Sequence, residues 1–97
     1  MTIIKIESNQ ANVPQIVKSA IWTEIKRLEI GLSRTEKEIR GFEDKYRVDS
    51  ETFLRRYAAE DLSGQDEEYI RWAGELRIRE RILEDLGKLK EIEYVSV

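Results

Sequence analysis

Residues 21–46 read IWTEIKRLEIGLSRTEKEIRGFEDKY, and this stretch decides the fold. Eight of its side chains, nearly all apolar, recur at alternating spacings of four and three residues. They are Ile21, Ile25, Leu28, Leu32, Thr35, Ile39, Phe42 and Tyr46. This heptad spacing places all eight along one side of an α-helix, with Thr35 as the one interruption. We call this stripe the seam, and it predicts a long helix that a second helix must cover.

The long helix extends beyond the seam toward the N-terminus. Val17 continues the stripe by one turn, Pro14 fits the first turn of a helix, and Asn12 suits the N-cap position. We therefore predict a helix over residues 13–46, about 50 Å long at the usual rise per residue. Its two glycines lie off the seam and weaken the helix without displacing the stripe.

Two further helices are expected after the long one. Asp49 is a suitable cap for a short helix over residues 50–61, and a third helix is predicted over residues 66–92. The apolar side chains of the third helix spread over an arc of about 220°. One neighbouring helix cannot cover such an arc. A second contact, from another subunit or a different protein, is therefore expected near Ile78 and Ile92.

Short β-segments are expected at both ends of the chain. Residues 2–7 are rich in β-branched side chains and alternate at their end, and residues 93–97 form a second β-prone tail. An antiparallel helical hairpin returns this tail to the start of the long helix. The two segments then either pair with each other or extend a sheet of a partner by β-augmentation, which is slightly favoured.

The predicted fold class is therefore mainly α. We expect a single domain over residues 1–97, built as a long antiparallel helical hairpin with a short bridging helix and short terminal β-segments. A core of this size buries only about 60–65% of the surface of the unfolded chain, so a partner or a second copy is expected to complete it.

The composition argues against most catalytic chemistry. The chain has 17 Lys+Arg and 20 Asp+Glu, a net charge of −3, and neither His nor Cys. The commonest metal ligand, the usual base at neutral pH and the thiol nucleophile are thus absent. We expect no enzyme activity, no cofactor and no metal site. Neither a secretion signal nor a membrane-spanning segment is indicated, so we expect a cytoplasmic location and no membrane partner.

Three short segments carry a resemblance to a known group of proteins. They are FEDKY at residues 42–46, SETF at residues 50–53 and DEEYIRW at residues 66–72. Together with the opening strand and long helix, this pattern resembles the small helical antitoxin-like proteins of microbial toxin–antitoxin modules. The resemblance implies a protein partner, such as a cognate toxin encoded beside the chain, and no chemistry of its own.

The resulting functional prediction is a protein-binding module, an antitoxin-like inhibitor that neutralises a partner protein. One alternative is a homo-oligomeric helical scaffold. The other is a DNA-binding autoregulator that resembles ribbon-helix-helix proteins, with a helix ending at Ile30 and a turn and capping box over residues 31–36. The predicted strand offers DNA only one basic and one acidic side chain. We therefore expect no nucleic-acid binding outside an autoregulatory role.

Two sets of candidate site residues follow. The partner-binding candidates are Trp22, Ile30, Tyr69, Trp72, Ile78, Ile92, Tyr94, Val95 and Val97. The candidates for an acidic patch are Glu60, Asp61, Asp66, Glu67 and Glu68. Each set has a plainer interpretation, because Tyr69 and Trp72 suit a hydrophobic core and the carboxylates suit a solvated turn and a helix start. The functional interpretation of the acidic patch is a phosphate mimic that blocks a basic partner.

Overall fold

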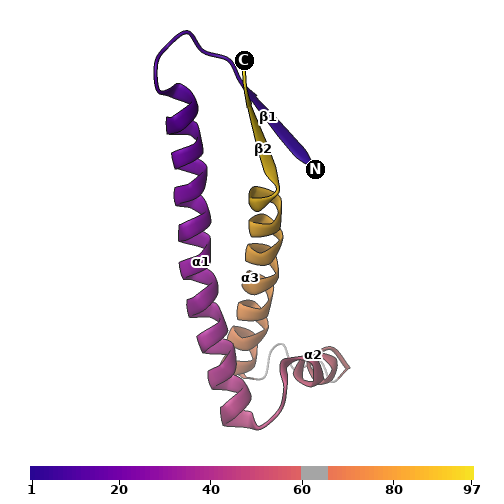
Figure 1. Cartoon of the computed structure of the whole chain (residues 1–97). Coiled ribbons are helices and arrows are strands. Elements are labelled where there is room, and N and C mark those ends of the chain that lie inside the picture. Colours follow the sequence, from indigo (N-terminus) through magenta and orange to yellow (C-terminus); the bar gives the residue numbers. More distant parts are fainter. Residues whose placement is uncertain (60–65) are drawn as a thin grey trace.

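The computed structural model describes residues 1–59 and 66–97 of the chain. The elements are β1 (Thr2–Ile6), α1 (Val13–Tyr46), α2 (Ser50–Ala59), α3 (Glu67–Lys90) and β2 (Ile92–Ser96). Helices α1 and α3 lie side by side and antiparallel, and α2 lies at the end of the hairpin where the chain turns back (Figure 1). The mainly α fold class, with a long hairpin, a bridging helix and terminal β-segments, is confirmed.

The element boundaries differ from the prediction mainly after α1. Helix α3 ends at Lys90 rather than at residue 92, because Ile92 already belongs to strand β2. The predicted end of the short helix, at residues 60–61, lies outside the described residues. The first strand ends at Ile6, one residue earlier than expected.

The starts of the helices show which capping predictions hold. The side chain of Asp49 accepts a hydrogen bond from the Thr52 amide at 2.7 Å, and Asp66 accepts one from the Glu68 amide at 2.8 Å. Asn12 occupies the N-cap position of α1, but its side chain makes no capping bond. Its φ of 68° is left-handed, a conformation that asparagine tolerates better than most residues.

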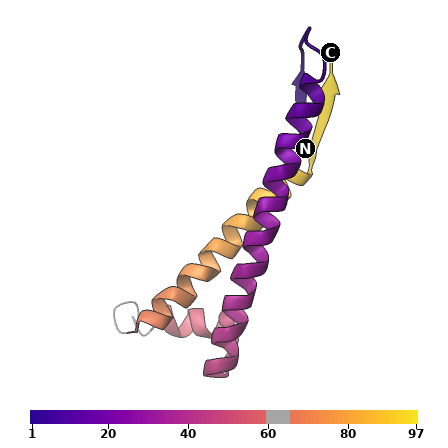
Figure 2. The ribbon, with the colours of Figure 1, turned by 90° about the vertical axis from the view of Figure 1, so that its left-hand side faces the viewer.

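The core lies at the end of the hairpin that carries α2. There Ile39 and Phe42 of α1, Phe53 of α2, and Trp72, Ala73 and Leu76 of α3 form one buried cluster. The two long helices spread apart at this end (Figure 2), and Phe53 packs with side chains of both in the cluster. Its ring stacks on that of Trp72 with centroids 3.9 Å apart. The short helix therefore closes the hairpin through an aromatic side chain.

Burial decreases along the seam toward the other end. Thr35, Ile39 and Phe42 are buried, whereas Ile21, Ile25, Leu28 and Leu32 are only half-buried. Two helices cover each other from one side only, so without a third element the seam stays partly exposed. Since only two long helices pack together, the molecule is long and thin, with extents of 59 × 21 × 19 Å.

The terminal strands pair with each other in parallel. Thr2 lies opposite Ile92 and Ile6 lies opposite Ser96, in a sheet of two strands. Both strands lie at the end of the hairpin opposite α2, close to both chain ends (Figure 1). The prediction that the two segments come within reach of each other is confirmed.

The continuity of α1 overturns the premise of the ribbon-helix-helix alternative. That interpretation needed a helix end at Ile30 and a turn over residues 31–36, but α1 runs without interruption from Val13 to Tyr46. The seam keeps its phase through Gly31 because the glycine lies off the stripe. In addition, β1 pairs with β2 of the same chain.

Candidate functional site

The terminal sheet has one face against the hairpin and one face open. On the inner face Ile6 is buried and Tyr94 is half-buried, with the Lys18 ammonium 5.6 Å from the centre of the Tyr94 ring. The outer face carries exposed apolar side chains at Ile3, Val95 and Val97. Successive side chains of a strand point to opposite faces, so these residues form an outward apolar surface beside Lys5 and Glu93.

The two edges of this sheet follow from the hydrogen bonds between its strands. The Val97 amide donates to the Ile6 carbonyl at 2.9 Å, so the even residues of β1 and the odd residues of β2 face each other. The backbone groups of Ile3 and Lys5 therefore point to one free edge, and those of Tyr94 and Ser96 to the other. Neither edge has a further strand among the described residues.

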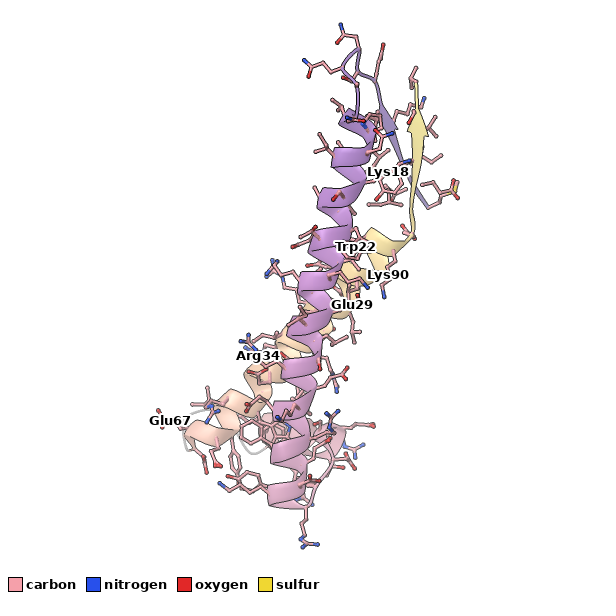
Figure 3. All side chains as sticks on the ribbon, turned by 60° about the vertical axis from the view of Figure 1, so that its left-hand side comes forward. Lys18, Trp22, Glu29, Arg34, Glu67 and Lys90 are labelled. Carbon is pink, nitrogen blue, oxygen red and sulfur yellow. The ribbon has the colours of Figure 1, made fainter. Side chains whose placement is uncertain are left out.

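Trp22 and Ile30 lie on the outer side of α1, as expected for residues off the seam. Trp22 is 60% exposed and Ile30 is 72% exposed. Figure 3 shows Trp22 in the half of α1 nearer the strands, close to Lys18, whereas Glu67 lies at the opposite end of the molecule. The Lys26 ammonium lies 5.4 Å from the Trp22 ring centre and covers part of it. Trp22 therefore remains available as a contact for a partner.

Two of the partner-binding candidates belong to the core instead. Trp72 has no exposed surface, and Tyr69 packs against the same cluster with its ring 5.4 Å from that of Tyr46. The assignment of Trp72 to a binding surface is therefore wrong in this structure. The assignment fails because Phe53 of α2 packs against the indole, in addition to side chains of α1 and α3, and completes its burial.

The remaining candidates are spread over the molecule. Ile78 is 47% exposed on α3, while Ile92 and Tyr94 are half-buried on the inner face of the sheet. Val95 and Val97 share the exposed outer face of the sheet, where Ile3 joins them. Ile3 was not among the predicted candidates, because only the pairing of β1 with β2 brings it beside Val95.

The acidic patch is not one surface in the described part of the chain. Glu60 and Asp61 lie outside the described residues, and Asp66 is the N-cap of α3. Glu68 contacts Lys45 and accepts a hydrogen bond from the Tyr46 hydroxyl at 2.9 Å. Of the described members, only Glu67 is fully exposed. The local ion pair and the cap account for the other two carboxylates.

The contacts of Glu68 with Lys45 and Tyr46 shift the pKa values of all three side chains. Hydrogen bonds from Lys45 and then from Tyr46 lower the pKa of Glu68 below its usual value. The bond to Glu68 raises the pKa of Lys45, and desolvation raises the pKa of Tyr46. These three side chains bond to one another beside the aromatic cluster, so we assign them a structural role.

A groove of about 790 Å³ lies between α2 and α3. The described residues that line it all belong to these two helices, and Leu54 and Leu83 are exposed at its sides. The groove was not predicted from the sequence, because the separation of Leu54 and Leu83 depends on how α2 sits against α3.

Within residues 1–59 and 66–97, no group of three or more carboxylates is arranged to hold a metal ion. No described helix is apolar over a length sufficient to cross a bilayer. The outer sheet face, the open strand edges and the α2–α3 groove offer backbone hydrogen bonds and apolar contacts.

Comparisons of the chain with protein-family models, with curated proteins and with solved structures give no match in any of the three. The resemblance to antitoxin-like proteins therefore stays a prediction, and it depends on the three sequence segments quoted above.

Proposed function

We propose that this chain is a protein-binding module that acts as an antitoxin-like inhibitor and neutralises a partner protein by terminal-strand and helical contacts. The observation that carries the proposal is the parallel pair β1–β2, with two open edges and an apolar outer face. A two-stranded sheet is marginal in water, and three or more strands are usual for independent stability. A partner with a free sheet edge supplies the missing strand by β-augmentation.

The exposed surface of the chain supports a partner as well. A folded monomer of 11.5 kDa exposes about 5,800 Å² on average, whereas this chain exposes 7390 Å². The excess on this one chain is about twice the roughly 800 Å² that a standard protein–protein interface takes from each partner. Trp22, on the outer side of α1, provides an aromatic anchor of the kind that dominates binding energy in many interfaces.

Inhibition by occlusion requires no chemistry from the inhibitor. The chain lacks His and Cys, and its described carboxylates serve ion pairs, caps and solvated surface. We therefore propose that the chain is not an enzyme and needs no cofactor. It is proposed to act in the cytoplasm, where a toxin encoded beside it would be made.

Co-expression tests this proposal. The product of the neighbouring open reading frame is expressed alone and together with this chain, and growth and co-purification are measured. We expect growth arrest from the neighbour alone, relief by co-expression, and a complex that survives size exclusion. A homo-oligomeric scaffold would give neither relief nor a complex, and that result would overturn the proposal.

Backbone variants test the strand contact within the complex. Lys5→Pro removes an outward N–H from the β1 edge, and Ser96→Pro removes one from the β2 edge, while the bonds between the two strands remain. We expect the proline at the edge used by the partner to weaken binding about tenfold. Lys5→Ala and Ser96→Ala are the matched controls, because they remove the same side chains and keep the amides. Unchanged binding by both proline variants would rule out the strand contact.

A further inference from the structure

The groove between α2 and α3 is separate from the terminal sheet and lies toward the other end of the hairpin. Its walls are Leu54 and Tyr57 of α2 and Leu76 and Leu83 of α3, and no residue of α1 lines it. Leu54 is 42% exposed and Leu83 is 49% exposed. Two large apolar side chains thus border one open groove that the hairpin itself does not fill.

The α3 side of the groove carries a pattern with twofold symmetry. Leu76, Arg79, Glu80 and Leu83 all line the groove, at the i, i+3, i+4, i+7 spacing of one helix face. Read from either end, the pattern is a leucine, a charged pair and a leucine. When a copy of the helix is turned end to end, the exposed Leu83 of one copy lies over Leu76 of the other, which is 6% exposed at the floor of the groove, and Arg79 lies opposite Glu80. Each of these pairs occurs twice.

We infer that a second copy of this chain occupies the groove, and that α3 of each copy packs antiparallel to α3 of the other about a twofold axis between Arg79 and Glu80. In a twofold interface the same patch faces itself, so it must be complementary to itself. The antiparallel register satisfies this requirement with two leucine pairs and two opposite-charge pairs. A parallel register would place Arg79 against Arg79 and Glu80 against Glu80.

The charges at the rim are compatible with a second copy. Among the described residues, the charged side chains that line the groove are Glu51, Arg77, Arg79 and Glu80, and their charges sum to zero. No ion pair is found for Arg77, Arg79 or Glu80 within the described residues. A rim of one sign would repel its own copy, whereas a rim with both signs does not.

The exposed area is large enough for both contacts. A standard interface takes about 800 Å² from each partner, and the chain exposes 7390 Å², well above the average for its mass. The dimer uses the groove near α2, whereas the proposed protein partner uses the strands at the far end (Figure 1). The two surfaces can therefore be occupied together, in an assembly of two inhibitors and two partners.

The mass of the isolated chain tests the dimer without any partner protein. Light scattering after size exclusion is expected to give twice 11.5 kDa at micromolar concentrations. Leu83→Glu places a charge in the apolar contact and is expected to give the monomer mass, with unchanged helical circular dichroism because Leu83 is half-exposed in one chain. Ile70→Glu is the matched control: Ile70 is 46% exposed on the same helix but does not line the groove.

Charge reversal tests the register. Arg79→Glu and Glu80→Arg are each expected to weaken the dimer about tenfold, and the double variant is expected to restore it, because the two opposite-charge pairs are re-formed with exchanged signs. A monomeric wild-type chain, a Leu83→Glu variant that dimerises like Ile70→Glu, or a double variant without recovery would each overturn the inference. A monomer whose groove is needed only for binding the neighbouring gene's product would instead assign the groove to that partner.

Discussion

At the scale of single residues, Trp72 joins all three helices. Its ring stacks on Phe53 of α2 and lies 5.7 Å from Phe42 of α1, and its indole N–H donates to the Ser50 hydroxyl at 3.0 Å. Ser50 in turn donates to the Glu43 carboxylate at 2.9 Å. The polar atom of a fully buried indole is thus satisfied by the first residue of α2, which fixes the position of that short helix.

Removal of the Ser50 hydroxyl tests this arrangement. Ser50→Ala leaves the buried Trp72 N–H without its acceptor, which is expected to lower the free energy of unfolding by about 1–3 kcal/mol. Urea unfolding followed by circular dichroism measures the change. Ser33→Ala is the control, because Ser33 is exposed on α1, and it should change stability by less than about 0.5 kcal/mol. Equal effects of the two variants would contradict the role of the hydroxyl.

Glu68 makes stability depend on pH. Its pKa is lowered in the folded chain by Lys45 and Tyr46, so its contribution is complete above the unfolded pKa of about 4.5. That contribution is lost as the pH falls through the lower folded pKa. We expect the melting temperature of Glu68→Gln to fall less steeply below pH 4.5 than that of the wild type.

The fall of the melting temperature at acid pH is not expected to disappear in Glu68→Gln. Asp49 and Glu24 also have lowered pKa values, through hydrogen bonds from Thr52 and Arg27 respectively. Glu67→Gln, at the exposed neighbouring position, is the matched control for the loss of one carboxylate. An unchanged slope in Glu68→Gln would contradict the assignment.

At the scale of elements, packing of the seam stabilises α1, whereas its glycines lower its helix propensity. A Cβ added at Gly41 meets no atom within 4 Å, and one added at Gly31 meets Ile82 Cδ1 at an ordinary contact of 3.6 Å. Gly41→Ala is therefore expected to raise the free energy of unfolding by about 1 kcal/mol. Gly31→Ala should give a similar gain, and chemical denaturation measures both. A loss of stability in Gly41→Ala would show that the helix needs the glycine for another reason.

Elements that depend on local signals could be predicted from the sequence, whereas contacts between distant residues could not. The seam, the cap at Asp49 and the carboxylates at the start of the third helix are local signals that act within one or two turns, and the helices that they predicted are present. The parallel register of β1 and β2 and the α2–α3 groove depend on residues far apart in the chain. No local pattern of Ile3 or Leu54 specifies which residue it will face, so these features emerged only from the packed structure.

At the scale of the whole molecule, stability is unevenly distributed. The radius of gyration is 19.0 Å, against about 12.5 Å expected for a compact domain of this length. The buried cluster lies at the α2 end, and the opposite end holds half-buried seam residues and two short strands. An elongated chain with one core is expected to open from the end without it.

Native-state hydrogen exchange tests this gradient. Amides near Ile39 of α1 and near Leu76 of α3 are expected to exchange most slowly, because only unfolding of the cluster exposes them. The bonded amides of β1 and β2 are expected to exchange faster, because a marginal sheet opens without disturbing the cluster. Deleting residues 94–97 should therefore speed exchange in β1 and leave exchange near Leu76 unchanged. Equal protection at both ends, or faster exchange near Leu76 after the deletion, would mean that the strands stabilise the whole chain rather than serve a partner.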